Sequence, residues 1–204
     1  MNIQTPFLYP ILDESRSVNL QRDAEAMITA GAKILQLRCK KMTNVDFYKL
    51  VTKIIPICKS QNVSLIVNDR VDVCLVTDIS GVHLGQDDFP VTETRQLLPD
   101  AIIGLSTHNI HQVQEADQLP IDYISIGSIF PTISKANPDP VVGIDLLRKA
   151  RSITSKPIVC IGGITENQIS ELLRSGTNGI AVISEVYKND DLSNNVQHLL
   201  KLFS

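Results

Sequence analysis

The sequence is poor in the features that mark nucleic-acid-binding proteins. Its 19 Lys and Arg residues are outnumbered by 22 Asp and Glu residues, which gives a formal net charge of −3 at pH 7. No basic run is long enough to follow a phosphate backbone over many nucleotides. We therefore expect no nucleic-acid partner.

Cysteine is also scarce, and its spacing excludes the usual cysteine-based sites. The four cysteines lie far apart and form no CxxC pair: Cys39, Cys58, Cys74 and Cys160. Paired spacing is what a metal site or a redox motif requires, so neither is indicated. Buried thiols in a reducing compartment are the expectation.

Long apolar runs are absent as well. No run approaches the roughly 20 residues that cross a membrane, and residues 1–12 have neither the basic nor the long apolar region of a signal peptide. We expect a cytoplasmic protein with no membrane partner.

What the chain does have is a regular alternation of short apolar runs and longer amphipathic stretches. With 43% hydrophobic residues in 204, it can build one sizeable core, so residues 1–204 are predicted to form one catalytic domain. The expected strands are Phe7–Leu12, Lys33–Leu37, Leu65–Val67, Gly81–Leu84, Ile102–Leu105, Tyr123–Ile126, Ile158–Ile161 and Gly179–Ile183. Eight short strands without a polar edge predict a single-domain (β/α)₈ TIM barrel, in the α/β class, and not an open sheet.

Local signals place several helices between these strands. Leu20–Ala30 ends at a glycine, and Asn44–Ser60 follows Thr43 as its N-cap, although Pro56 should kink or shorten that helix. Thr165 and Gln168 resemble a capping box, and the last helix is expected at Leu192–Leu202.

Charged residues follow several of the predicted strands, where barrel enzymes keep their active sites. Three are cations, Arg38, Lys40 and Lys135, and two are carboxylates, Asp69 and Asp88. Cations and separated carboxylates at one barrel mouth suit a diphosphate bound with Mg²⁺. An alternative role for Asp69 is to cap the helix that begins near residue 71.

A second phosphate site is indicated at the last two strands. Gly162 and Gly163 follow the seventh strand, and Ile183 and Ser184 follow the eighth, where barrels often hold a phosphate on backbone N–H groups. The long irregular stretch Gly127–Val142 is typical of an active-site lid. No nucleophile–base pair is evident, so electrostatics and positioning should carry the chemistry.

Three ring-bearing residues have open roles. His83 is expected to be a packed, hydrogen-bonded residue of the barrel. His108 is either a wall of the substrate pocket or a loop residue, and Tyr9 is either a core residue or a stacking partner for a substrate ring.

Seven ordered motifs together suggest a family. They are QLRCK (36–40), VNDR (67–70), GVHLGQDD (81–88), GLSTH (104–108), GSIFPTISK (127–135), IGGI (161–164) and AVIS (181–184). With them the chain resembles the thiamine-phosphate synthase family over nearly its whole length. The resemblance implies a transferase of thiamine biosynthesis that joins a pyrimidine diphosphate to a thiazole phosphate and releases pyrophosphate. It also implies a dissociative mechanism with Mg²⁺.

The resemblance also implies roles for individual residues. The pyrimidine diphosphate would contact Gln36, Leu37, Arg38, Cys39, Lys40, Asn68, Ser106 and Lys135, of which Arg38, Lys40, Ser106 and Lys135 would be catalytic. The thiazole phosphate would contact Thr132, Ile133, Ser134, Gly163, Ile183 and Ser184. Mg²⁺ would be held by Asp69 and Asp88.

The chain departs from the family pattern at three places. Ser134 replaces a threonine, LYPILD lacks the usual threonine before its aspartate, and Glu185 follows Ser184 where a small residue is usual. A carboxylate next to a phosphate pocket is unfavourable unless it points away.

Rival functions are weighed against the same residues. A thiazole tautomerase of the same barrel type typically lacks the counterparts of Asp88 and Lys135, and a non-catalytic phosphate-ligand sensor should have lost metal ligands or cations. A sugar-phosphate isomerase would explain only the second phosphate site. The sequence leaves open whether the protein is a homo-oligomer.

Overall fold

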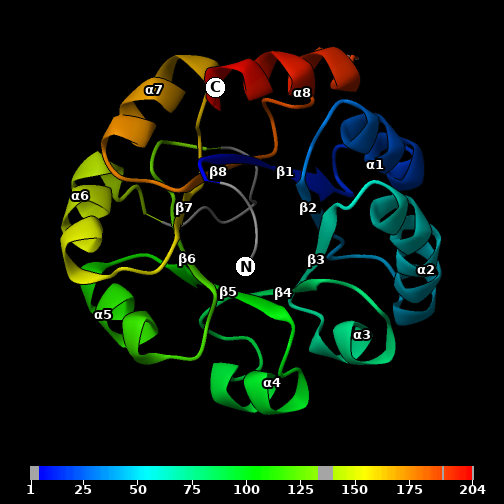
Figure 1. Ribbon diagram of the computed structural model, residues 1–204, viewed down its shortest axis with the longest axis horizontal. Coiled ribbons are helices and arrows are strands. Elements are labelled where there is room, and N and C mark those ends of the chain that lie inside the picture. The colour runs from blue at the N-terminus through cyan, green and yellow to red at the C-terminus, as the bar shows by residue number, and fades with distance from the viewer. Residues whose placement is uncertain (1–4, 133–139, 190, 204) are drawn as a thin grey trace.

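The computed structural model describes residues 5–132, 140–189 and 191–203. Eight parallel strands form a closed barrel in chain order, and a helix follows each strand on the outside (Figure 1). The strands are β1 (Phe7–Asp13), β2 (Ile34–Arg38), β3 (Ser64–Asn68), β4 (Gly81–Leu84), β5 (Ile102–Thr107), β6 (Tyr123–Ile126), β7 (Ile158–Cys160) and β8 (Gly179–Val182). The helices are α1 (Leu20–Thr29), α2 (Asn44–Ser60), α3 (Val71–Val76), α4 (Val91–Leu97), α5 (Ile110–Gln118), α6 (Gly143–Ile153), α7 (Glu166–Arg174) and α8 (Leu192–Leu200). The predicted TIM barrel is confirmed.

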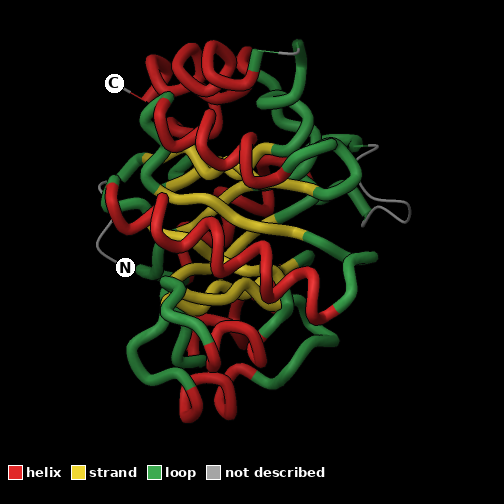
Figure 2. The backbone as a smooth tube through the Cα atoms, turned by 90° about the vertical axis from the view of Figure 1, so that its right-hand side faces the viewer, coloured by secondary structure: helices red, strands yellow, loops and turns green. Residues whose placement is uncertain are grey.

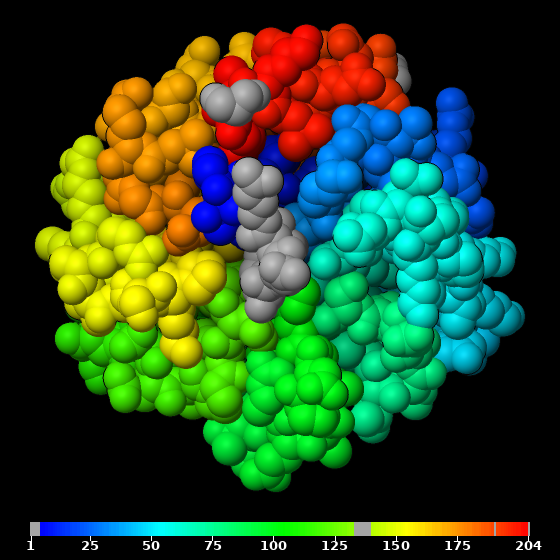
Figure 3. Space-filling view, in the orientation of Figure 1, coloured from blue at the N-terminus to red at the C-terminus, as the bar shows by residue number. Residues whose placement is uncertain are grey.

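The first and last strands close the ring. β1 pairs in parallel with both β2 and β8, with Tyr9 opposite Ala181 and Leu12 opposite Leu37. The first and last units therefore lie side by side, as the blue and red regions of Figure 3 show. Viewed from the side, the strands stack across the middle of the molecule between the helices (Figure 2).

Side-chain alternation along the strands builds two separate cores. Every second residue points into the barrel, where eight buried side chains, among them Tyr9 and Tyr123, form an inner cluster. The residues between them point outward and pack against the helices in a much larger outer cluster. Each strand is thus buried on both faces, which explains its nearly continuous apolar sequence.

Helix boundaries follow the capping signals closely. Thr43 accepts a hydrogen bond from the Asp46 amide at the start of α2, and the capping box of Thr165 and Gln168 opens α7. Pro56 lies inside α2 and does not shorten it, so that part of the expectation is wrong. Pro56 and Thr52 both lie on the exposed face, so the carbonyl left without a partner by the proline can be hydrated.

The end of the chain differs slightly from expectation. α8 ends at Leu200, and Lys201–Phe203 form a 3₁₀ turn in place of a last turn of α-helix. Among the residues that the structure describes, no helix is long and apolar enough to cross a membrane.

Candidate active site

A single large cavity lies at the carboxyl ends of the strands. It has a volume of about 530 Å³. All eight strands contribute side chains, and the floor includes Tyr9, Ile11, Val159 and Ala181 from the inner cluster. A cavity of this size suits a drug-sized or larger ligand.

An ion pair with a buried carboxylate fixes one cation at this cavity. The Arg38 guanidinium lies 2.6 Å from the Asp13 carboxylate, which is only 1% exposed. Burial alone would raise the pKa of Asp13, but hydrogen bonds from Ser15 and Arg38 hold it below its ordinary value. Asp13 therefore stays charged and orients Arg38, whose side chain lines the cavity.

Lys40, Asp69 and Asp88 form a second charged group beside the cavity. Lys40 Nζ makes an ion pair with Asp69 Oδ2, and Asp88 accepts a hydrogen bond of 2.6 Å from the Gly85 amide. Burial and then the nearby Asp69 raise the pKa of Asp88. Two carboxylates held this close repel each other, and a bound cation would relieve that repulsion.

The donor set fits a magnesium ion that is shared with a substrate. Among residues 5–132, 140–189 and 191–203, no group of three or more His, Cys, Asp or Glu side chains could hold a metal. Mg²⁺, however, commonly uses one or two carboxylates together with substrate phosphates and water. Asp69 and Asp88 meet that requirement.

Asp69 does not act as the helix cap that was its alternative role. α3 begins after Arg70, and its N-terminus has no side-chain hydrogen bond. The Asp69 backbone adopts a φ of 64°, a conformation that aspartate tolerates better than most residues. Its carboxylate turns instead toward Lys40 and Asp88.

The opposite side of the mouth is built mainly from backbone. Gly162 and Gly163 have φ angles of +99° and +64°, and a Cβ on Gly163 would lie 2.3 Å from the Pro131 carbonyl oxygen. The Phe130 amide donates to the Gly162 carbonyl at 2.9 Å. The loops after β6 and β7 are therefore joined tightly, at a distance only glycine permits.

The sequence-predicted residues divide into three groups by position. Those lining the cavity are Gln36, Arg38, Asn68, Ser106, Thr132, Gly163, Ile183 and Ser184. Lys40, Asp69 and Asp88 do not line it and lie in the loops after β2, β3 and β4. Ile133, Ser134 and Lys135 lie outside the described residues, as does much of the expected lid.

Leu37 and Cys39 are placed differently from their predicted neighbours. Leu37 is fully buried in the outer cluster because it alternates with Gln36 and Arg38, which face inward. Cys39 packs against the same cluster, and burial raises the pKa of its thiol to about 12. Neither residue is among those that line the cavity.

The three ring-bearing residues have defined positions. His83 is packed and hydrogen-bonded, as predicted, and Tyr9 is a core residue that also lines the cavity. His108 lines the cavity and its Nδ1 lies 2.7 Å from the Gly127 carbonyl oxygen, so its ring forms part of the wall.

Sequence reasoning did not single out two polar residues that line the cavity, Arg16 after β1 and Ser125 within β6. It also missed two residues that support the site, Asp13 at the end of β1 and Tyr123 at the start of β6. A carboxylate at a strand end was the available signal for Asp13. Tyr123 gave none, because a tyrosine opening a predicted strand is ordinary core material.

Glu185 lines the cavity, so it does not simply point away from it. Its carboxylate lies 3.2 Å from Lys188 Nζ and is 10% exposed. The neighbouring ammonium offsets the charge that would otherwise oppose a phosphate.

Comparisons with known proteins agree with this geometry. A profile of the thiamine monophosphate synthase family matches residues 8–186. Thiamine-phosphate synthase of Persephonella marina is 39% identical over 196 residues, covering 94% of this chain and 93% of that protein. The corresponding enzyme of Vibrio campbellii is 41% identical over 197 residues, covering 96% and 97%.

A solved structure carries the comparison into three dimensions. Thiamine phosphate pyrophosphorylase from Pyrococcus furiosus superposes with a TM-score of 0.89 at 31% identity, over 97% of this chain and 95% of that one. The barrel and its order of units are thus shared as well as the sequence. The chain belongs to the thiamine monophosphate synthase family, which confirms the thiamine-phosphate synthase, a transferase, that its motifs predict.

Proposed function

We propose that this barrel mouth joins a pyrimidine methyl diphosphate to a thiazole phosphate, giving thiamine phosphate and pyrophosphate. The observation that carries the proposal is the charged group formed by Arg38, which lines the cavity, and by Lys40, Asp69 and Asp88 in the loops after β2, β3 and β4, opposite a side of the mouth that is built from backbone. The two ends suit two different phosphate groups. One end would bind its phosphate through cationic side chains and a metal ion, and the other through backbone amides. The relatives' name, thiamine-phosphate synthase, supports the same product.

The charged end is assigned to the diphosphate. Arg38, oriented by Asp13, donates to its oxygens, and Lys40 moves from Asp69 to the diphosphate as the complex forms. Asn68 and Ser106 orient the pyrimidine, and Lys135 completes the cation set. Asp69 and Asp88 would hold Mg²⁺, which would supply positive charge to offset the negative charge that develops on the leaving group.

The backbone end is assigned to the thiazole phosphate. Gly163, Ile183 and Ser184 present amide and hydroxyl groups at the ends of β7 and β8, and Thr132 faces them from the loop after β6. Ile133 and Ser134 belong to the same proposed set. This placement directs the thiazole nitrogen toward the centre of the cavity.

The reaction proceeds by departure of the diphosphate before attack. The C–O bond to the diphosphate breaks, its electrons leave with pyrophosphate, and the positive charge spreads over the amino-substituted pyrimidine ring. The lone pair of the thiazole nitrogen then forms the new C–N bond. No general base is needed, because the attacking nitrogen carries no proton, so the residues contribute charge and orientation.

The setting of the enzyme is part of the same proposal. All four cysteines are free thiols, in keeping with a reducing cytoplasm. Residues 1–204 act as one catalytic domain, and the substrates are its expected small-molecule partners.

The test is pyrophosphate release by the purified protein with both substrates, with and without Mg²⁺, together with detection of thiamine phosphate. Metal-dependent release that requires both substrates is the expected result. Exchange of a thiazole tautomer without condensation would assign the chain to the tautomerase type. Binding of the phosphates without any reaction would indicate a sensor.

A further inference from the structure

Five polar groups, four of them buried and one half-buried, cross the inside of the barrel beneath the active site. Gln36 Nε2 lies 3.1 Å from Tyr9 Oη, which lies 3.1 Å from Tyr123 Oη. Tyr123 Oη lies 2.8 Å from His83 Nδ1, and His83 Nε2 lies 2.9 Å from Ser106 Oγ. The groups come from β2, β1, β6, β4 and β5, so only the closed barrel brings them together.

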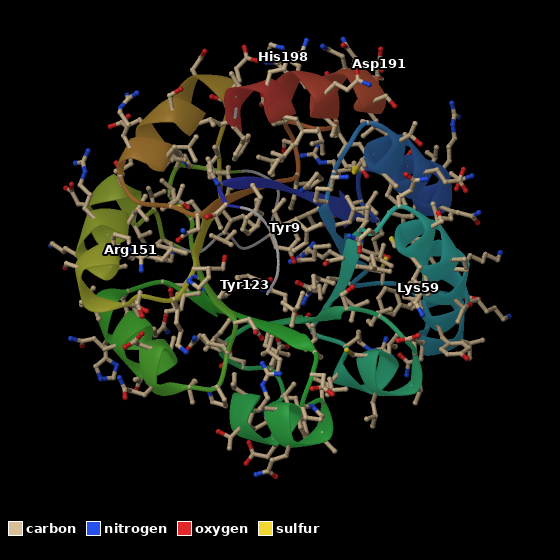
Figure 4. All side chains as sticks on the ribbon, in the orientation of Figure 1. Tyr9, Lys59, Tyr123, Arg151, Asp191 and His198 are labelled. Carbon is tan, nitrogen blue, oxygen red and sulfur yellow. The ribbon has the colours of Figure 1, made fainter. Side chains whose placement is uncertain are left out.

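Close packing of the rings fixes the positions of these hydrogen-bonded groups. The Tyr123 ring stacks on His83 with an interplanar angle of 17° and meets Tyr9 edge-on at 78°. Gly104 lies beside Tyr123 on the adjacent strand, and a Cβ there would lie 2.0 Å from Tyr123 Cζ. Glycine at position 104 therefore leaves the space that the Tyr123 ring occupies. Tyr9 and Tyr123 both point into the centre of the barrel (Figure 4).

The hydrogen bonds in this series all run in one direction, from Gln36 toward Ser106. An amide nitrogen can only donate, so Tyr9 Oη accepts from Gln36 and sends its one proton to Tyr123 Oη. Tyr123 in turn sends its proton to His83 Nδ1. A neutral imidazole that accepts at Nδ1 carries its proton on Nε2, and it donates that proton to Ser106.

Because the Gln36 amide turns its nitrogen, and not its oxygen, toward Tyr9, the opposite direction leaves a buried donor without an acceptor. If Ser106 donated to His83, the protons would run back to Tyr9, whose hydroxyl would then face the Gln36 amide nitrogen as a second donor. If His83 were doubly protonated, its Nδ1 could not accept, and the Tyr123 hydroxyl would likewise be left without an acceptor. Tyr123 is fully buried and Tyr9 is 1% exposed, so such a group could not turn to water.

Both tyrosines also keep their protons. Burial raises the pKa of Tyr9 and of Tyr123 above the ordinary tyrosine value. Both hydroxyls are therefore neutral at physiological pH.

We infer, on the basis of the substrate site proposed above, that this one-way chain fixes Ser106 as a hydrogen-bond donor to the substrate, with Tyr123 and His83 as positioning residues. Ser106 Oγ accepts from His83, lines the cavity, and has no second partner among the described residues. Its own proton is therefore free for an acceptor on the ligand, such as a ring nitrogen or a phosphate oxygen.

Two substitutions at His83 separate the effect of the hydrogen-bond direction from the effect of losing the imidazole ring. In His83→Gln the side-chain amide can place an N–H near the position of Nε2, whereas in His83→Asn it reaches only the position of Nδ1. We expect His83→Gln to keep kcat within about threefold and His83→Asn to lose about tenfold, the scale of one hydrogen bond. The KM for the thiazole phosphate should stay unchanged in both. Equal losses in the two variants would overturn the inference.

Tyr123→Phe tests the step before His83 and keeps the ring that packs against Gly104. Without the hydroxyl, Nδ1 of His83 loses its donor, and kcat should fall about tenfold with the KM for the thiazole phosphate unchanged. Undiminished kcat in a folded variant would contradict the role of Tyr123.

A direct readout does not depend on turnover. Histidine ring-nitrogen NMR on isotope-labelled, substrate-free protein, with the signals assigned by their loss in His83→Gln, should show His83 neutral and protonated at Nε2. Tyr123→Phe should change this to a mixture of the two tautomers. A wild-type proton on Nδ1, or on both nitrogens, would overturn the inference even if condensation is confirmed. The expected tautomer in a protein that makes no thiamine phosphate would refute the proposed function alone.

Discussion

The two sides of the active-site mouth are built on different principles. The charged side, made of Asp13, Arg38, Lys40, Asp69 and Asp88, consists of side chains that hold one another by ion pairs. The backbone side, made of Thr132, Gly162, Gly163, Ile183 and Ser184, depends on the course of the chain itself. Removing one side chain from the charged side should therefore change the charge of the site. Adding atoms to the backbone side should instead change its shape.

Removing a cation from the charged side should have the largest effect. Arg38→Ala should lower kcat on the order of 10²–10³, because one preorganised electrostatic contact with the leaving group is lost. Lys135→Ala is expected to cost the same. Steady-state kinetics should be compared with Arg148→Ala, which removes an exposed cation whose partners are Asp145 and Glu171. Unchanged turnover in Arg38→Ala would remove it from the catalytic set.

The partner of that cation should matter next. Asp13→Asn should lower the free energy of unfolding by about 2 kcal/mol at pH 7, the scale of hydrogen bonds to a charged group. Because the pKa of Asp13 is lowered in the folded protein, its charge contributes fully to the free energy of unfolding above the pKa of the unfolded state, which is about 4. It is lost as the pH falls further, through the lower pKa of the folded state.

Urea denaturation of wild type and Asp13→Asn at a series of pH values measures this difference. The gap between the two proteins should shrink at acid pH. Asp145→Asn serves as the control, since its carboxylate is 84% exposed. A gap that stays constant into strong acid would show that Asp13 is not charged in the folded state.

A matched pair of glycines tests the backbone side. Gly163→Ala and Gly143→Ala both place alanine at a positive φ, of +64° and +72°, but only the first meets other atoms, and nothing lies within 4 Å of a Cβ on Gly143. Gly163→Ala should therefore be less stable than Gly143→Ala by about 1–2 kcal/mol in urea denaturation. It should also raise the KM for the thiazole phosphate. Equal stability losses would mean that the loops have room to move apart.

The smallest effect is expected at Glu185, the carboxylate on the backbone side. Glu185→Gln should lower the KM for the thiazole phosphate by about twofold, since its charge is already offset by Lys188. Lys188→Gln should move the same KM upward. Parallel shifts in the two variants would show that neither charge is felt at the phosphate.

How much of this could be predicted from the sequence depends on the distance between the interacting residues. Strand positions were predicted to within one or two residues, because burial on both faces leaves an apolar run that periodicity detects. The placement of Arg38 and Ser184 at the carboxyl ends followed from the barrel rule alone.

Contacts across the barrel were beyond such reasoning. The pairing of Asp13 with Arg38 depends on the register of β1 against β2, and the chain from Tyr9 to His83 depends on the tilt of all the strands. The motif QLRCK also suggested one continuous contact surface, whereas alternation turns Leu37 away from the cavity. Sequence patterns identify strand ends but do not fix which side chains meet.

The small inner cluster has a consequence for how such an enzyme can change over time. Tyr9, Ile11, Val159 and Ala181 are at once the centre of the fold and the floor of the cavity. A mutation that reshapes the floor of the cavity therefore also lowers the free energy of unfolding, which is small for any domain. New substrate preferences should evolve through the loops at the mouth, while the barrel interior drifts slowly and the outer faces of the helices vary freely.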